Sequence, residues 1–196
     1  MKSLTVALLA VVVLGAELAS AQPAADAKAR GYFNFYGRGA RSAMRGARDS
    51  AGAFREYIRS TRPGTPQIVR EQPGPRADVI VRVQPEVIVV SPRIAQAATD
   101  EIGDYIAKSE RHLAWMRRQA ESLKDQATLA ALDSIDRNLA AAKVNHATLC
   151  GCCMEDNVDA VAAMACCQKI DDALAKAISE HDALMKRLGE QQPAPN

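Results

Sequence analysis

The residues best able to do chemistry in this 196-residue chain are five cysteines and one histidine that fall within a single stretch of the sequence. Thiolate and imidazole groups are soft ligands that suit Zn(II), and a thiolate-rich set suits Cu(I). If residues 146–167 form an antiparallel helical hairpin, His146 and Cys167 share a layer, and Cys150 lies one turn from His146. The sequence therefore indicates a candidate copper or zinc site with the ligands His146, Cys150, Cys153, Cys166 and Cys167.

The same cysteines have a second interpretation, as disulfides, and we favour it. Five cysteines in an exported chain most simply form two bridges and leave one thiol over for intermolecular or redox use. A bridge from one of the cysteines in residues 150–153 to Cys166 or Cys167 would staple the hairpin, although the spacing leaves the connectivity open. The disulfide candidates are Cys150, Cys152, Cys153, Cys166 and Cys167.

Residues 146–167 also resemble part of the copper-storing and copper-binding four-helix proteins. Those families repeat C-x-x-x-C along several helices, whereas no C-x-x-x-C spacing occurs in this chain. The resemblance therefore implies no membership and assigns no ligand.

The N-terminal segment has the features of a secretory signal peptide. Lys2 provides a short positive region, Leu4 to Leu14 is apolar apart from Thr5, and Ala19-Ser20-Ala21 is a small-x-small cleavage signal. The apolar run is shorter than the roughly 20 residues that a spanning helix needs, and we identify no other membrane-spanning segment. We expect cleavage after Ala21 and a secreted or periplasmic protein.

Charge is divided unequally along the chain, although the total is only +2. Residues 22–93 contain 13 basic and six acidic residues, a net charge of +7, and residues 94–196 have a net charge of −5. Six of the eight aromatic residues also lie in the basic part. We therefore expect a basic arm and an acidic domain.

Seven arginines of the basic arm recur at steps of three, four or seven, which places them on one helical stripe beside an apolar stripe. Guanidinium groups bind phosphate or carboxylate bidentately, so an anionic surface, a polyanion or an acidic protein is a candidate partner. Nucleic acid is disfavoured, because no single-strand-binding module accompanies the arginines. The alternative is that the helix packs on the acidic half of the same chain. The candidate anion-binding residues are Arg38, Arg41, Arg45, Arg48, Arg55, Arg59 and Arg62.

A connector with six of the nine prolines separates the two halves. Its β-branched runs, residues 79–83 and 87–90, are strand candidates that could pair with each other or with another chain. Pro85 between them weakens a hairpin assignment. Oligomerisation through residues 79–90 is therefore one expectation.

The acidic half predicts three antiparallel helices, because apolar residues recur at alternating steps of three and four. Their expected starts are Ser91-Pro92, Asp125 and Asn157. The fold class is mainly α, a three-helix bundle that becomes a four-helix bundle if the Arg-rich helix folds back. The expected divisions are a signal peptide (1–21), a basic arm (22–62), a Pro-rich connector (63–92), a helical bundle (93–190) and a disordered tail (191–196).

No catalytic signature stands out: there is no Ser-His-Asp order, HExxH motif or phosphate-cradling glycine loop. We therefore predict no enzyme. The favoured function is an exported structural or interaction protein, a disulfide-stapled bundle that presents the basic arm to an anionic partner. The alternative is a copper- or zinc-binding protein that uses the Cys/His cluster.

Overall fold

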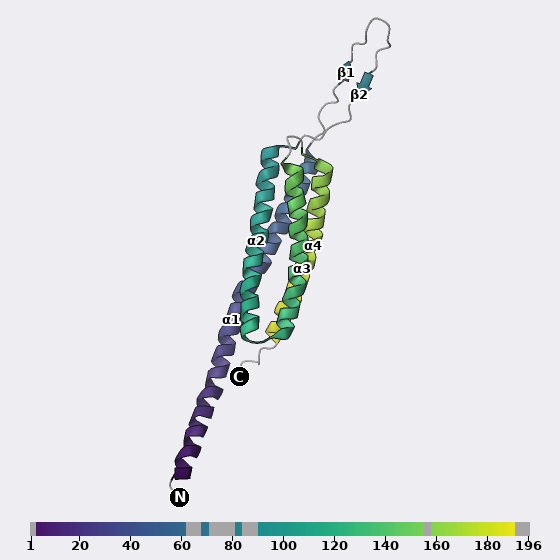
Figure 1. Ribbon diagram of the computed structural model, residues 1–196. Helices are drawn as coiled ribbons and strands as arrows, with labels where there is room; N and C mark the ends of the chain where they lie inside the picture. Colours follow the sequence, from purple (N-terminus) through teal and green to yellow (C-terminus); the bar gives the residue numbers. More distant parts are fainter. Residues whose placement is uncertain (1–2, 62–67, 71–80, 84–89, 155–157, 191–196) are drawn as a thin grey trace.

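The computed structural model describes residues 3–61, 68–70, 81–83, 90–154 and 158–190. Four long helices run alternately up and down: α1 (Ser3–Ser60), α2 (Pro92–Ser122), α3 (Gln126–Cys153) and α4 (Ala160–Glu190) (Figure 1). The predicted mainly α bundle is confirmed, and the Arg-rich segment supplies its fourth helix.

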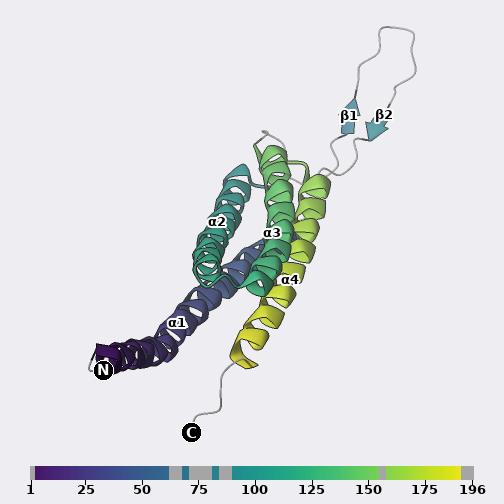
Figure 2. The same ribbon diagram turned by 60° about the horizontal axis from the view of Figure 1, so that its bottom comes forward.

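The helices form a closed ring in which each packs against two others. Helix α1 packs against α2 and α4, and α3 packs against the same two helices from the other side (Figure 2). The Arg-rich segment is therefore an integral wall of the bundle, as the intramolecular alternative for this segment predicts.

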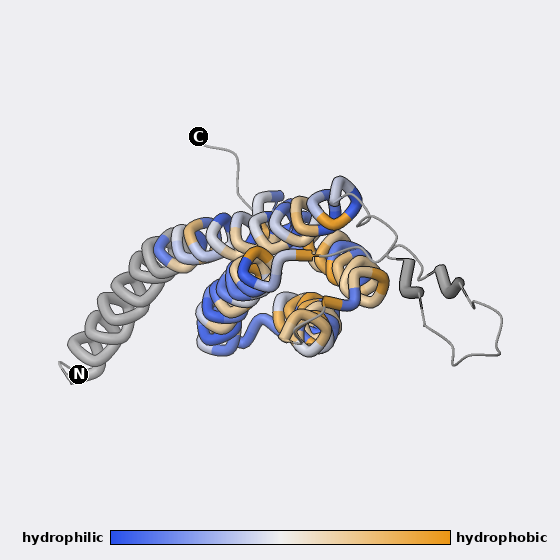
Figure 3. Tube along the Cα trace, turned by 90° about the horizontal axis from the view of Figure 1, so that it is seen from above, coloured by the Kyte–Doolittle hydropathy of each residue, from blue (hydrophilic) through white to orange (hydrophobic). Residues whose placement is uncertain are grey.

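The predicted seams supply the core. In α1 the apolar stripe from Ala40 to Ile58 is buried, and the apolar sides of the described helices turn toward one another (Figure 3). Much of this core is alanine, whose small side chain lets neighbouring helix backbones approach closely. Buried seam residues of the other helices include Ile102, Ile106, Leu113, Leu132, Ile135, Leu139, Ile170, Leu174 and Leu184.

Local capping sets the helix boundaries. Asp125 begins α3 as predicted, because its carboxylate accepts a 2.9 Å hydrogen bond from the Thr128 amide. The Ser91 side chain makes no capping bond, so α2 depends on Pro92 at its first position. The cap predicted at Asn157 lies outside the described residues, and Asp159 accepts from the Ala162 amide at 2.9 Å at the start of α4.

The connector contains one short antiparallel pair of strands, β1 (Ile68–Arg70) and β2 (Val81–Val83). One predicted strand is thus present, and its partner is the segment around Val69, whereas pairing with residues 87–90 was one of the alternatives from the sequence. Only three residues separate the two predicted runs, and Pro85 among them cannot donate a ladder hydrogen bond. Residues 84–89 lie outside the described part of the chain, so oligomerisation through this region stays a prediction.

Several helix glycines make room for a ring on the neighbouring helix. A methyl group added at Gly46 would lie 2.6 Å from the Tyr105 ring, and one at Gly39 would lie 2.6 Å from the His112 ring. His146 approaches Gly103 in the same way, and at Gly37 it is the Met185 side chain that takes the space, 2.6 Å from an added methyl group. These glycines are therefore packing positions, although each weakens the helix propensity of its own helix.

Gly46→Ala and Gly52→Ala form a matched pair that tests this packing. Both changes gain the same helix propensity, but only the first places a methyl group against a ring, since nothing lies within 4 Å of the second position. We expect Gly52→Ala to raise the free energy of unfolding by about 0.5–1 kcal/mol. Gly46→Ala should be less stable than Gly52→Ala by about 1–3 kcal/mol. Urea denaturation followed by circular dichroism measures both, and equal stabilities would contradict the ring contact.

Candidate functional site

The cysteines gather at the end of the bundle where α3 meets α4. Cys153, Cys166 and Cys167 are buried, and Cys150 and Cys152 are half-buried. All five are free thiols, with no pair of sulfur atoms within 4.5 Å. The predicted disulfide staple is therefore wrong.

The predicted metal site is wrong as well. Within the described residues no group of three or more His, Cys, Asp or Glu side chains could hold a metal ion. The expected layer of His146 with Cys167 does not form, although α3 ends at Cys153 and α4 begins at Ala160, which are placed symmetrically about the expected turn. Cys152 lies close to Cys166 and Cys153 close to Cys167, and His146 lies nearly two turns from Cys152 along α3.

His146 instead makes a local structural contact. Its Nε2 atom lies 2.8 Å from the carbonyl oxygen of Thr99 on α2 and 3.5 Å from Sγ of Cys150. A carbonyl oxygen only accepts hydrogen bonds, so Nε2 of His146 carries a hydrogen and donates a hydrogen bond to the Thr99 oxygen. That nitrogen has no lone pair left for a metal, and His146 ties α3 to the first turns of α2.

Burial makes these thiols poor ligands and poor nucleophiles. It raises the pKa of Cys167 to about 12 and that of Cys153 to about 11, and the neighbouring thiols reinforce both shifts. Burial also raises the pKa of Cys150 and of Cys166. Metal binding and thiol exchange both need the thiolate, so Cys153 and Cys167 behave as packed apolar residues at neutral pH.

The arginines of α1 divide into two rows with different surroundings. In one row, Arg41 pairs with Asp182 of α4 at 2.5 Å and Arg48 pairs with Asp171 at 2.5 Å. Arg55, in the same row, donates to Gln168 of α4. These three residues are seven apart, so they repeat on one side of the helix and attach α1 to α4.

The second row contains Arg38, Arg45 and Arg59, also spaced by sevens. The Nε–H group of Arg38 donates a 3.2 Å hydrogen bond to the carbonyl oxygen of Asn34. The guanidinium of Arg59 lies 3.8 Å from the carboxylate of Glu56 on the same helix. Among the described residues, no carboxylate lies within ion-pair distance of Arg38 or Arg45. Arg62 lies outside the described part of the chain.

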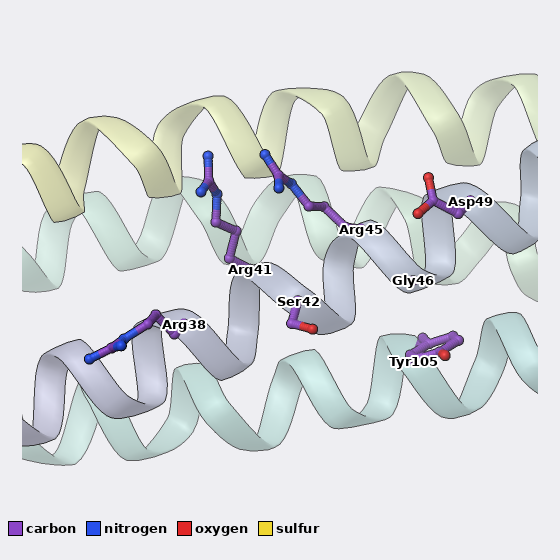
Figure 4. Close-up of a pocket in the computed structure, with 7 residues that line it drawn as sticks. All are labelled: Arg38, Arg41, Ser42, Arg45, Gly46, Asp49 and Tyr105. Atoms are coloured by element: carbon purple, nitrogen blue, oxygen red, sulfur yellow. The ribbon is translucent and has the colours of Figure 1, made fainter.

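Arg38 and Arg45 line an open pocket of about 470 Å³ on the outer side of α1. Figure 4 shows Arg41 and Arg45 projecting side by side, with Tyr105 on the neighbouring α2. Three guanidinium groups and one carboxylate give the pocket a net positive charge. Its complete lining is Arg38, Arg41, Ser42, Arg45, Gly46, Asp49 and Tyr105.

The sequence analysis missed the hydroxyl and aromatic members of this pocket. Ser42 lies one residue from the predicted stripe, and Tyr105 belongs to another helix, so neither could be placed before α1 was known to pack on α2. The spacing by sevens was visible in the sequence and could have separated the two arginine rows.

Comparison with known proteins adds nothing to these assignments. No family model, curated protein or solved structure matches this chain. Among the described residues, no helix has both the length and the apolar character required to cross a membrane.

His181 is the most enclosed ionisable group near the pocket. Its side chain is 1% exposed, and Nδ1 lies 3.6 Å from a carboxylate oxygen of Asp182, the partner of Arg41. Burial lowers the pKa of His181 below its usual value, and Asp182 opposes the shift. The neutral imidazole therefore belongs to the folded state.

Thiol labelling tests the burial of the cysteines. We expect Cys167 and Cys153 of the native protein to react with iodoacetamide at least about tenfold more slowly than unfolded thiols at pH 8, because their pKa values are raised to about 12 and about 11. All five should react rapidly in guanidinium chloride. Peptide mass spectrometry gives the rate at each site, and rapid native labelling of Cys167 would contradict its burial.

The pH dependence of stability tests His181. Its folded pKa lies below the unfolded value of about 6.5, so the unfolded chain binds a proton first as the pH falls. The free energy of unfolding should hold above pH 6.5 and decrease below it. His181→Leu should lose less stability than the wild type between pH 7.5 and 5.5, as measured by urea denaturation. Burial also lowers the pKa of His112, so the His181→Leu variant should still lose some stability as the pH falls. An equal loss in both proteins would assign the slope elsewhere.

Proposed function

We propose that this chain is an exported, non-catalytic binding protein whose four-helix bundle holds an anionic partner at Arg38 and Arg45 of α1. The observation that carries the proposal is the division of the arginines. Three of them have polar partners on α4, whereas Arg38 and Arg45 line the pocket without a carboxylate partner among the described residues. The bundle itself does not need their charge.

The charge of α1 supports an anion as the partner. From residue 28 to residue 48 the helix has six basic residues and no acidic one, and Asp49 is the first carboxylate after them. Asp182 and Asp171 neutralise two of the six, Arg41 and Arg48. An anion at the pocket would meet guanidinium groups that can bind it bidentately, together with nearby hydroxyl groups of Ser42 and Tyr105.

The N-terminal sequence supports export, because Lys2, the apolar run to Leu14 and the small residues at Ala19 and Ala21 have the order of a cleavable signal. The absence of a catalytic constellation in the sequence supports a binding role. The proposal needs neither a disulfide nor a metal, since the bundle core and the ion pairs between α1 and α4 hold the fold.

Charge removal at the two arginine rows tests the proposal. We expect the protein to bind heparin at low ionic strength, and we expect this affinity to fall as the salt concentration rises. The double variant Arg38→Gln with Arg45→Gln should bind about tenfold more weakly at low salt. Its plot of log affinity against log salt should be shallower by about 1 for each guanidinium group that no longer binds a heparin anion. Fluorescence titration with labelled heparin measures both quantities.

The double variant Arg48→Gln with Arg55→Gln is the matched control, because it also removes two guanidinium charges but from the row that faces α4. It should keep most of the heparin affinity and lose up to about 1 kcal/mol of stability, the value of an exposed ion pair. Absent or salt-insensitive heparin binding by the wild type would contradict the proposed function. An equal loss of affinity in the control and in the variant of Arg38 and Arg45 would contradict the assignment to these two residues.

A further inference from the structure

Four aromatic side chains form a continuous cluster on the outside of α1 and α2, which we call the ring platform: Tyr32, Phe35, Tyr36 and Trp115. Tyr36 stacks on Trp115 across the two helices, with ring centroids 5.6 Å apart and planes 11° apart. Tyr32 stacks on Tyr36 at 6.2 Å, and Phe35 meets Tyr36 edge-on at 5.2 Å. The stack therefore holds rings from two helices as one surface.

Three rings of the platform are open to solvent. Phe35 is 67% exposed, Trp115 is 49% exposed and Tyr32 is 42% exposed. The chain has only eight aromatic residues, and its buried rings are Phe33 and Phe54. Leaving this much ring surface in water stabilises nothing in the isolated bundle, and a phenylalanine has no polar group for water to satisfy.

Cationic side chains surround the rings. The guanidinium of Arg118 lies 4.9 Å from the centre of the Trp115 ring. Burial lowers the pKa of the neighbouring His112, and the charges of Lys108 and Arg111 lower it further. Arg38 follows Phe35 by one turn of α1, so the platform is continuous with the anion pocket.

We propose that the ring platform docks on the surface of an anionic phospholipid bilayer. This inference rests on the proposed function and names its anionic partner. The rings of Phe35, Trp115 and Tyr32 insert at the level of the headgroups, where amphipathic rings are most stable. Arg38, Arg45 and Arg118 bind lipid phosphates around them.

A bilayer fits the platform better than a soluble polyanion does. A polysaccharide or an acidic protein segment offers charge, but it does not offer the apolar layer that would take Phe35 out of water. A bilayer combines phosphate groups with acyl chains, and these match the arginines and the solvent-exposed rings on one surface.

Trp115 is the only tryptophan of the chain, so its fluorescence reports the platform directly. The processed protein from the exported fraction would be mixed with vesicles of phosphatidylcholine containing 30% phosphatidylglycerol, with pure phosphatidylcholine vesicles and with heparin. We expect the emission of Trp115 to shift to shorter wavelength, and its quenching by acrylamide to fall at least about twofold, with the anionic vesicles only.

Vesicle sedimentation with variants separates the rings from the charges. Phe35→Ala keeps the fluorescent probe and should reduce partitioning into anionic vesicles about tenfold, because one ring stays in water. The same variant should leave heparin affinity unchanged. Met154→Ala is the control, because Met154 is 85% exposed at the far end of the bundle and should have no effect.

The outcomes distinguish this inference from the function on which it rests. Heparin binding without vesicle binding, vesicle binding without a change at Trp115, or unaltered partitioning of Phe35→Ala would each overturn the bilayer assignment and leave an anionic partner in place. Failure to bind either heparin or anionic vesicles would overturn the proposed function, and the bilayer assignment with it.

Discussion

Close packing of α1 between α2 and α4 is the constraint on which the rest of this structure depends. The seam of α1 is mostly alanine, with Met44, Phe54 and Ile58 as its larger members. Small seam residues bring helix backbones together and leave little room for rings between them. Gly46 makes room for the Tyr105 ring, Phe33 and Phe54 are the rings buried in the bundle, and Trp115 lies on its outside. The narrow interface therefore limits the number of rings between the helices without excluding them.

The same packing explains how opposite charges are used. The basic and acidic parts of the chain meet where Arg41 and Arg48 contact Asp182 and Asp171. Exposed ion pairs contribute little stability each, so their main effect is to fix which side of α1 faces α4. That orientation leaves the second arginine row on the outside of the bundle. Attachment and binding are thus separated on one helix by a rotation of less than a quarter turn.

The sequence was sufficient for those features that depend on spacing within one helix. Alternating steps of three and four located the seams, and Asp125 located the start of α3. Features that depend on the turn between two helices could not be predicted from the sequence. The path of the chain between α3 and α4 sets which layers face each other, and it places Cys166 and Cys167 beside Cys152 and Cys153 instead of beside His146. The wrong metal prediction follows from that shift, and the disulfide prediction is wrong because no two cysteine sulfur atoms lie within 4.5 Å.

The candidate site was half predictable for a related reason. Its arginines were visible as a stripe, but a stripe does not say which charges are already neutralised, because the neutralising carboxylates lie on α4, more than a hundred residues away. An anionic partner that took Arg41 or Arg48 would have to displace Asp182 or Asp171 and so loosen α1 from the bundle. A partner at Arg38 and Arg45 displaces no carboxylate among the described residues and leaves those ion pairs intact. Arg38 and Arg45 are therefore the part of the stripe at which binding costs the fold least.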